Sequence, residues 1–309
     1  MTKNSKKQTK RELQAKVAEA AVLGLAQREA NSLVIGIDLG DRMSNYCVRI
    51  RESQEVIVEG TIATTLRGLG DFFQQLKRQR VVVETGTHSR WVAQLLNLLG
   101  HEAIVANSRK LKLITENNQK SDKVDARLLS KLGCVGIEWL HPVYQRSEAV
   151  HRDLMVVRAR QALVEVRTGL INHVRGAVKS FGCRVSTCDA DRFVEVAQRE
   201  IPAALQGALS GVLAALVEVA EQIYSYDCQV KHLCESKHRQ TRWLTQIGGV
   251  GPVTALTYVL TIEDPGRFER SREVGAYVGL VTKQRQSGKR DPQLGITKTG
   301  DELLRKLLV

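Results

Sequence analysis

The sequence lacks the features of a membrane or secreted protein. No unbroken apolar run reaches the roughly 20 residues that a helix needs to cross a bilayer. The first thirty residues are polar and begin with basic side chains, without the compact apolar stretch and cleavage site of a signal peptide. We therefore expect a cytoplasmic protein that makes no use of a membrane.

Cysteine is scarce, and its spacing does not favour a metal site. The chain has 6 cysteines. Two close pairs, Cys183 with Cys188 and Cys228 with Cys234, could hold zinc together with a nearby histidine. Their spacings are wider than the two to four intervening residues usual in zinc motifs. We interpret these cysteines as reduced thiols.

Acidic residues are outnumbered by basic ones. Lys and Arg total 46 against 33 Asp and Glu, which gives a formal net charge of +13. The basic residues are spread along the whole chain and are not confined to one amphipathic helix, so nucleic acid is favoured as the partner. A membrane surface and simple solubility are the alternatives.

Hydrophobic periodicity divides the 309 residues into four regions. Residues 1–32 read as a basic helical extension, and 33–146 read as three strands followed by alternating helices and strands. We expect this second region to be an α/β domain of the ribonuclease-H-like (RuvC-like) class, although other mixed α/β folds share the order. Residues 147–242 indicate a long helical or coiled-coil region. Residues 243–309 indicate a mostly helical C-terminal domain with a helix-hairpin-helix-like element at Ile247-Gly248-Gly249-Val250-Gly251.

Four acidic residues are conspicuous in this basic chain. Asp38 and Glu84 each end an apolar run that is typical of a buried strand, while Asp122 and Asp125 are spaced to share one helix face. In the expected fold the first and fourth strands are neighbours and the last helix crosses close by. The four carboxylates could therefore meet in one site, although each taken alone fits a turn former or a helix-start acid equally well.

Clustered carboxylates in a basic protein favour Mg²⁺ acting on a phosphate backbone. Mg²⁺ prefers oxygen ligands, and two such ions can flank a scissile phosphate. Basic side chains near the acids, the glycines of a hairpin that could hold a phosphate, and basic residues around Ser287 complete the candidate nucleic-acid contacts. These are Lys120, Lys123, Arg127, Gly249, Gly251, Lys283, Arg285, Lys289, Arg290 and Lys298.

Ser287 lies in a strongly basic segment. Cations can stabilise the charge that develops when a serine attacks a phosphate. No histidine stands beside Ser287 to act as a base, and most serines in basic loops only donate or accept hydrogen bonds. Composition by itself therefore favours the hydrogen-bonding role over the nucleophile.

The motifs together resemble a known family from about Val34 to the chain end. It is the insertion sequence one-hundred-ten family of transposases, which includes related site-specific DNA invertases and pairs a RuvC-like DEDD domain with a C-terminal serine transposase domain. The motifs are Ile35-Gly36-Ile37-Asp38, Glu84-Thr85-Gly86-Thr87, Lys120-Ser121-Asp122-Lys123-Val124-Asp125-Ala126, Ile247-Gly248-Gly249-Val250-Gly251, Ala276-Tyr277-Val278-Gly279-Leu280, Ser287-Gly288 and Gly295-Ile296-Thr297-Lys298-Thr299-Gly300.

The resemblance implies a transposase or site-specific recombinase that cuts and rejoins DNA. It implies that Asp38, Glu84, Asp122 and Asp125 bind Mg²⁺ and that Ser287 attacks DNA. It further implies donor and target DNA as substrates, a structured guide RNA encoded by the element, and a homo-oligomer of two to four subunits. Such a protein would work in the bacterial cytoplasm at the nucleoid.

The position at which the chain ends leaves other functions open. Family members usually continue beyond the position of Val309, so we expect a truncated C-terminal domain. A RuvC-like nuclease that uses water, with Ser287 idle, and an inactive nucleic-acid-binding remnant are the competing hypotheses.

Overall fold

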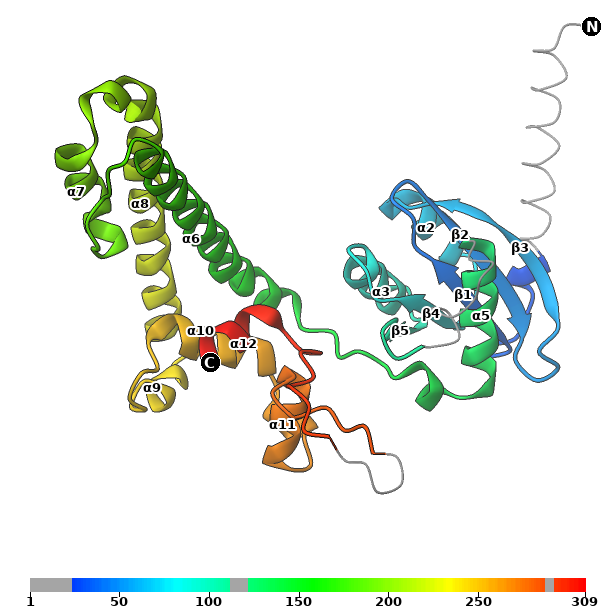
Figure 1. Ribbon diagram of the computed structural model, residues 1–309. Coiled ribbons are helices and arrows are strands. Elements are labelled where there is room, and N and C mark those ends of the chain that lie inside the picture. Colours follow the sequence, from blue (N-terminus) through cyan, green and yellow to red (C-terminus); the bar gives the residue numbers. More distant parts are fainter. Residues whose placement is uncertain (1–23, 112–121, 287–291) are drawn as a thin grey trace, which may run out of the picture. The chain divides into compact units, whose positions relative to one another are not determined.

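The computed structural model describes residues 24–111, 122–286 and 292–309, and of Asp122 only the backbone. The chain divides into two compact units, Met1–Gln145 and Arg146–Val309, which are described one after the other (Figure 1).

A mixed sheet forms the centre of the first unit. Its strands are β1 (Leu33–Asp38), β2 (Met43–Ile50), β3 (Val56–Ala63), β4 (Arg80–Glu84) and β5 (Glu102–Ala106). Within the described residues the spatial order is β3-β2-β1-β4-β5, with β1, β2 and β3 antiparallel and β4 and β5 parallel to β1. The meander and the adjacency of β1 to β4 agree with the order that the sequence predicts.

Helices pack against both faces of this sheet because successive strand residues point to opposite sides. One face of β1 and β4 joins α2 (Leu66–Phe73) and α3 (Ser89–Leu98) in the main core. The other face packs against α5 (Asp122–Val135) and the short 3₁₀ helix η1 (Ile137–Leu140) in a second core. Buried apolar side chains on both faces of β1 explain why its sequence is an unbroken apolar run.

The last residues of the basic extension predicted for residues 1–32 pack into the first unit. Leu25 is 2% exposed and belongs to the main core cluster. The backbone carbonyl of Glu29 accepts a hydrogen bond from the side chain of Gln79, and the carboxylate of Glu29 forms an ion pair with Lys77. Residues 25–32 are therefore part of this unit, and the expectation of an appendage over the whole range is wrong for them.

Two long helices build the second unit. They are α6 (Glu148–Ser180) and α8 (Ala203–Ser236), which run side by side and are joined through η2 (Ala190–Arg192) and α7 (Phe193–Glu200) (Figure 1). A leucine-rich seam of α8 packs on α6 and α7. Three arginines of α6 pair inside the unit: Arg158 with Asp301, Arg160 with Asp227, and Arg167 with Asp191.

α8 bears on the expectation that the protein makes no use of a membrane. The helix is long and apolar enough, by length and composition alone, to cross a bilayer. Its apolar residues are interrupted by Gln, Ser and Glu, so no unbroken run of about 20 residues marks it. Leu209, Leu213 and Leu216 are buried against the neighbouring helices of the unit. A core helix passes the same test, so the composition of α8 is weak evidence for a membrane.

The C-terminal part of the second unit packs on the base of these helices. Its elements are α9 (Thr241–Leu244), α10 (Pro252–Ile262), η3 (Pro265–Arg267), α11 (Ser271–Val278) and α12 (Glu302–Leu308). Buried side chains of α6, α8 and α10 form one shared cluster. The long helices and the C-terminal segment therefore fold as a single body.

Candidate functional site

Neighbouring strands bring two of the four carboxylates to one edge of the sheet. β1 and β4 are parallel, and their last registered pair is Ile37 with Val83. Asp38 follows Ile37 and Glu84 follows Val83, and each is the last residue of its strand. Because paired residues of adjacent parallel strands point to the same side, these two half-buried side chains share a face of the sheet.

That face is covered by α5, whose backbone lies unusually close to β1. A Cβ atom on Gly36 would lie 2.3 Å from the carbonyl oxygen of Ala126 and 2.4 Å from the amide nitrogen of Ser130. A Cβ atom on Gly133 would lie 2.7 Å from the side chain of Val34, near the other end of β1. The helix therefore runs antiparallel to β1, and its first turn lies over the strand end that carries Asp38.

The second pair of acids begins this helix. Asp122 is the first residue of α5, and its side chain lies outside the described part of the structure. Asp125 is 5% exposed. Ala126 and Gly133 are spaced by two whole turns and fall on the helix face turned to the sheet. Asp38, Glu84 and the first turn of α5 are thus brought to the same end of the same face.

Asp38, Glu84 and Asp125, the three predicted ligands with described side chains, are not gathered into a ready-made metal centre. Within the described ranges, no group of three or more His, Cys, Asp and Glu side chains is arranged to hold an ion. The carboxylate of Asp122 lies outside the described side chains. All 6 cysteines lie in the described residues as free thiols.

Sequence reasoning missed a histidine beside the same sheet edge. His88 Nε2 lies 3.7 Å from Asp41 Oδ1, and the indole N–H of Trp91 donates to His88 Nδ1 at 3.0 Å. Asp41 follows β1 and His88 follows β4, so the contact joins the two loops that leave the strands of Asp38 and Glu84. A single histidine in a loop gives no local signal of such a partner.

The basic residues predicted near the acids have different surroundings. Lys123 is exposed on α5, whereas Lys120 lies outside the described residues. Arg127 forms a bidentate ion pair with Glu59 of β3. The hydrogen bond from Arg127 lowers the pKa of Glu59 from its ordinary value. Arg127 therefore ties α5 to the sheet, and its contact with nucleic acid stays a prediction.

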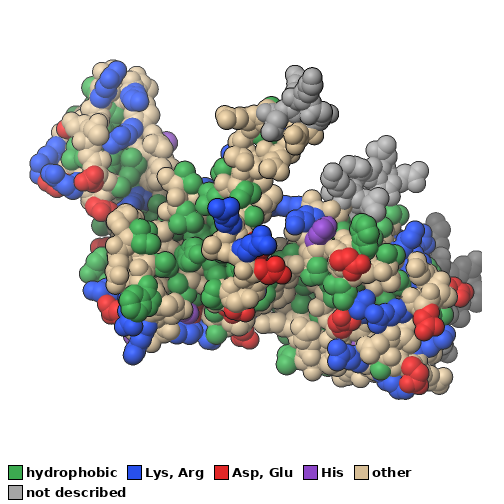
Figure 2. Space-filling view, turned by 90° about the horizontal axis from the view of Figure 1, so that it is seen from below, with side chains coloured by type: hydrophobic (Ala, Val, Ile, Leu, Met, Phe, Trp, Pro, Cys, Tyr) green, Lys and Arg blue, Asp and Glu red, His purple; other side chains and the backbone are tan. Residues whose placement is uncertain are grey.

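The segment that carries Ser287 is closed by backbone pairing. Thr282 and Ile296 form an antiparallel bridge, and the N–H of Lys283 donates to the carbonyl of Gly295 at 3.0 Å. Lys283, Arg285 and Lys298 are exposed. Ser287, Lys289 and Arg290 lie outside the described residues. Lys and Arg side chains are scattered over the face seen in Figure 2 and do not gather in one patch.

The glycine hairpin before α10 is only partly the predicted motif. Gly249 has a φ of +86°, which favours glycine, and Gly251 is the N-cap of α10. The helix before the hairpin, α9, is four residues long. The element is thus a single helical turn, a glycine turn and a helix.

Comparison with known proteins agrees with these motifs. The model of the transposase IS116/IS110/IS902 family matches residues 241–309, and the DEDD transposase model of the IS110 type matches residues 35–182.

Relatives cover different shares of the chain. The transposase for insertion sequence element IS1111A of Coxiella burnetii is 32% identical over 165 residues, which cover 50% of this chain and 44% of that protein. The transposase for IS1328 of Yersinia enterocolitica is 26% identical over 288 residues, 90% of this chain and 82% of its own length. A probable family 20 transposase of Pseudomonas aeruginosa is 26% identical over 245 residues, with shares of 77% and 72%.

The family motifs and the matches agree from the first strand to the last helix. One family model covers most of the first unit and continues into α6, the other covers the C-terminal part of the second unit, and relatives from three organisms are named as transposases. The chain belongs to the IS116/IS110/IS902 family of transposases, enzymes that cleave and join DNA.

Proposed function

We propose that the protein is a transposase or site-specific recombinase that cuts and rejoins DNA with Mg²⁺ and a serine nucleophile. The observation that carries the proposal is the common sheet end of Asp38, Glu84 and the first turn of α5. We infer that this first unit is a ribonuclease-H-like domain.

The donor set suits Mg²⁺. Asp38, Glu84, Asp122 and Asp125 offer carboxylate oxygens, the ligands that this ion prefers. Asp125 is buried to 5% exposure, and a buried carboxylate needs positive charge nearby to remain ionised. Bound there, Mg²⁺ would polarise a scissile phosphate and offset the charge of the acids.

Ser287 is the proposed nucleophile. Its Oγ attacks the phosphorus, the new P–Oγ bond links the serine to the 5′ phosphate, and the P–O3′ bond breaks. The departing 3′ oxygen takes up a proton, and the serine hydroxyl gives up its own. Lys283, Arg285, Lys289 and Arg290 surround the serine in sequence and would stabilise the charge on the phosphate oxygens.

The partners follow from the same proposal. Donor and target DNA are the substrates, and a structured RNA from the element selects them by base pairing while the basic protein holds the backbones. We propose that the protein assembles as a dimer to tetramer and acts at the nucleoid in the bacterial cytoplasm. The exposed apolar side chain of Val217 and the ring of Tyr224 on α8, 44% and 72% exposed, support self-association.

A nuclease is the second candidate. All four acids belong to the first unit, whereas Ser287 belongs to the second. A carboxylate site of this kind needs only water as its nucleophile, so the first unit could hydrolyse DNA while the serine stays idle. This division of the chain is the observation that keeps the alternative open.

Trapping a covalent adduct separates the candidates. The protein is incubated with labelled target DNA, the transcribed flanking RNA of its element and Mg²⁺, then denatured and separated by electrophoresis. We expect a DNA–protein adduct that disappears in Ser287→Ala and persists in Thr282→Ala, which lies in the same ribbon.

Other outcomes decide against the proposal. Cut DNA without an adduct supports the nuclease. Salt-dependent binding without cleavage supports an inactive remnant. An adduct that persists in Ser287→Ala overturns the assignment of the nucleophile.

A further inference from the structure

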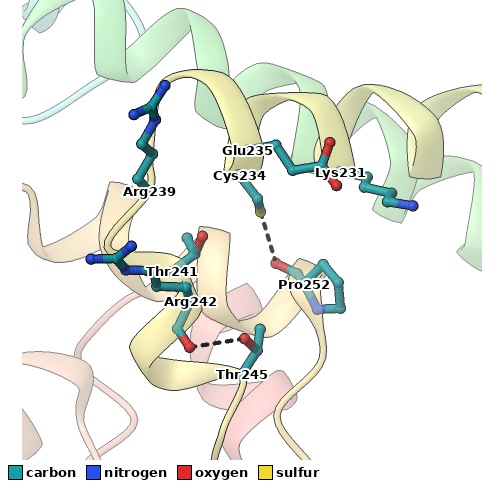
Figure 3. Close-up of a pocket in the computed structure, with 8 residues that line it drawn as sticks. All are labelled: Lys231, Cys234, Glu235, Arg239, Thr241, Arg242, Thr245 and Pro252. Carbon is teal, nitrogen blue, oxygen red and sulfur yellow. Dashed lines mark hydrogen bonds between the residues drawn. The ribbon is translucent and has the colours of Figure 1, made fainter.

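A pocket of about 400 Å³ opens where α8 turns into α9, and α10 begins beside it. Figure 3 shows its lining residues: Arg239 extends from the turn and Arg242 from α9, while Lys231 and Glu235 lie along α8. Pro252, the first residue of α10, closes the opposite wall. None of these residues belongs to the carboxylate site or to the Ser287 segment.

The charge of the pocket is positive and uncompensated. Lys231, Arg239 and Arg242 line it, and Glu235 alone is acidic among the described lining residues. Across the described part of the chain, no carboxylate lies within ion-pair distance of these three cations. The arginines of α6 differ, because Arg160 and its neighbours pair with acids of the same unit. A free cluster of this kind attracts anions.

An exposed aromatic ring stands beside the cations. Trp243 is 60% exposed, and the guanidinium of Arg242 lies over its ring at 4.7 Å from the centroid. Ile247, at the start of the glycine hairpin, is also 57% exposed. A large indole left in solvent next to two arginines is typical of surfaces on which bases stack.

The base of the pocket is held in place by buried bonds. Asp153 of α6 accepts hydrogen bonds from Lys237 at 2.6 Å and from His238 at 2.8 Å, and both donors lie directly before Arg239. Thr241 bonds to the carbonyl of His238 at 2.8 Å. The turn with Arg239 and the start of α9 with Arg242 are therefore fixed before any ligand arrives, which lowers the entropy cost of binding.

We propose that this pocket binds an unpaired nucleotide of a nucleic-acid strand. The guanidinium groups of Arg239 and Arg242 hold the phosphate, Lys231 adds charge from α8, and Trp243 stacks on the base. Arginine suits phosphate because its planar fork gives two hydrogen bonds at once. The strand is unpaired because a base inside a duplex does not offer its face to a side chain. The inference rests on the proposed function only in taking nucleic acid as the partner.

Binding of labelled single strands to the full-length protein tests the proposal. Fluorescence anisotropy is measured with oligo-dT and oligo-rU of about 20 nucleotides and with a DNA duplex, at several salt concentrations and without Mg²⁺. We expect the double variant Arg239→Gln/Arg242→Gln to bind single strands at least about tenfold more weakly. Its log–log salt slope should fall by about one to one and a half, since each single-strand phosphate contact contributes about 0.7.

Trp243 gives a second readout. Trp243→Ala should weaken single-strand binding by about 5- to 100-fold, whereas Trp243→Phe should retain most of the affinity because a phenyl ring also stacks. Matched controls are Arg67→Gln/Arg199→Gln, two exposed arginines that pair within their own helices, and Trp139→Ala, whose ring is 58% exposed. Circular dichroism melting confirms that each variant is folded.

The outcomes separate this inference from the proposed function. Equal affinity and salt slope in the wild type and the arginine variant overturn it, as does a Trp243→Ala effect no larger than that of Trp139→Ala. A duplex effect equal to the single-strand effect also overturns it. Preference for oligo-rU over oligo-dT assigns the strand to RNA, and the reverse preference assigns it to DNA. Adduct formation by Ser287 is scored separately, so either idea can fail without the other.

Discussion

The carbonyl oxygen of Ala126 in α5 lies 2.3 Å from the position that a Cβ atom would take on Gly36 of β1. No real Cβ tolerates such a distance, so glycine is what allows the helix to rest on the strand. Gly36 stands two residues before Asp38 and Ala126 stands one after Asp125. This contact therefore sets the separation between the strand acids and the helix acids.

Gly36→Ala should displace α5 and destabilise the first unit. The added methyl group meets backbone atoms of Ala126 and Ser130, which cannot move without moving the helix. Overpacking of this kind costs about 1–3 kcal/mol. Hydrogen exchange of amides in β1 and β4 measures the free energy of unfolding of this unit.

The matched control is Gly70→Ala in α2. A Cβ on Gly70 meets nothing within 4 Å, and the position is inside a helix. Alanine should stabilise the unit there by about 0.5–1 kcal/mol. If Gly36→Ala behaves like Gly70→Ala, the packing of α5 on β1 is not as close as described.

Lowering the pH below about 6.5 should weaken the first unit through His101. His101 is 4% exposed; its Nδ1 accepts from the N–H of Gln79 at 3.1 Å, and its Nε2 bonds with the carbonyl of Phe73 at 3.0 Å. These partners require the neutral ring, and burial lowers the pKa of His101 from 6.5. The folded state therefore resists the proton that the unfolded chain accepts.

The sign of this effect fixes the pH window. Stability from His101 is complete above pH 6.5 and is lost as the pH falls toward the lower pKa of the folded state, by at most about 1.4 kcal/mol per pH unit. His101→Gln should make the free energy of unfolding less dependent on pH in this range, measured by hydrogen exchange. His173→Gln, at an exposed position, serves as the control. An unchanged slope in His101→Gln contradicts the prediction.

Asp153→Asn should destabilise the second unit at neutral pH by about 3 kcal/mol, because it leaves the donors of Lys237 and His238 without their carboxylate. Burial alone would raise the pKa of Asp153, but the hydrogen bonds from these two residues outweigh it and lower the pKa below 3.8. Stability from the carboxylate is thus present above pH 3.8 and lost as the pH falls below it.

Chemical unfolding at pH 7 and below pH 3.8 checks this. The difference between the wild type and Asp153→Asn should shrink in acid. Asp191→Asn breaks an ion pair in which the aspartate is 83% exposed, and should cost at most about 1 kcal/mol. If both variants lose a similar free energy of unfolding, the burial of Asp153 does not strengthen its ion pair.

Local patterns carried most of what the sequence could predict. Apolar runs that end in Asp38 and Glu84 indicated neighbouring strand ends, and the spacing of Asp122 and Asp125 indicated a helix face. Contacts between distant residues left no such trace. The pairing of His88 with Asp41 and of Arg127 with Glu59 depends on how strands and loops meet, which no window of sequence contains.

Three other features that the sequence did not predict have simple reasons. Leu25 looks like one apolar residue in a polar helix, and only the assembled core shows that it is buried. α8 escaped attention as an apolar segment because single polar residues interrupt it. Trp243 and its basic neighbours lie just before the Ile247-Gly248-Gly249-Val250-Gly251 motif but outside it, so the motif did not direct attention to them.

Asp125→Asn should remove the response of the protein to Mg²⁺ while leaving the fold intact. On the proposed function the charge of Asp125, 5% exposed in the first turn of α5, would hold a divalent cation, and asparagine has the same shape but lacks that charge. At a Mg²⁺ concentration ten times the dissociation constant, the wild type should gain about 1.4 kcal/mol of stability. Thermal melting with and without Mg²⁺ measures this gain.

Asp71→Asn, an exposed acid of α2, should keep the full gain. Duplex binding without Mg²⁺ should be equal in all three proteins, because phosphate contacts by basic residues carry it. A Mg²⁺-dependent gain in Asp125→Asn equal to that of the wild type would remove Asp125 from the metal site and leave the site to the other three acids.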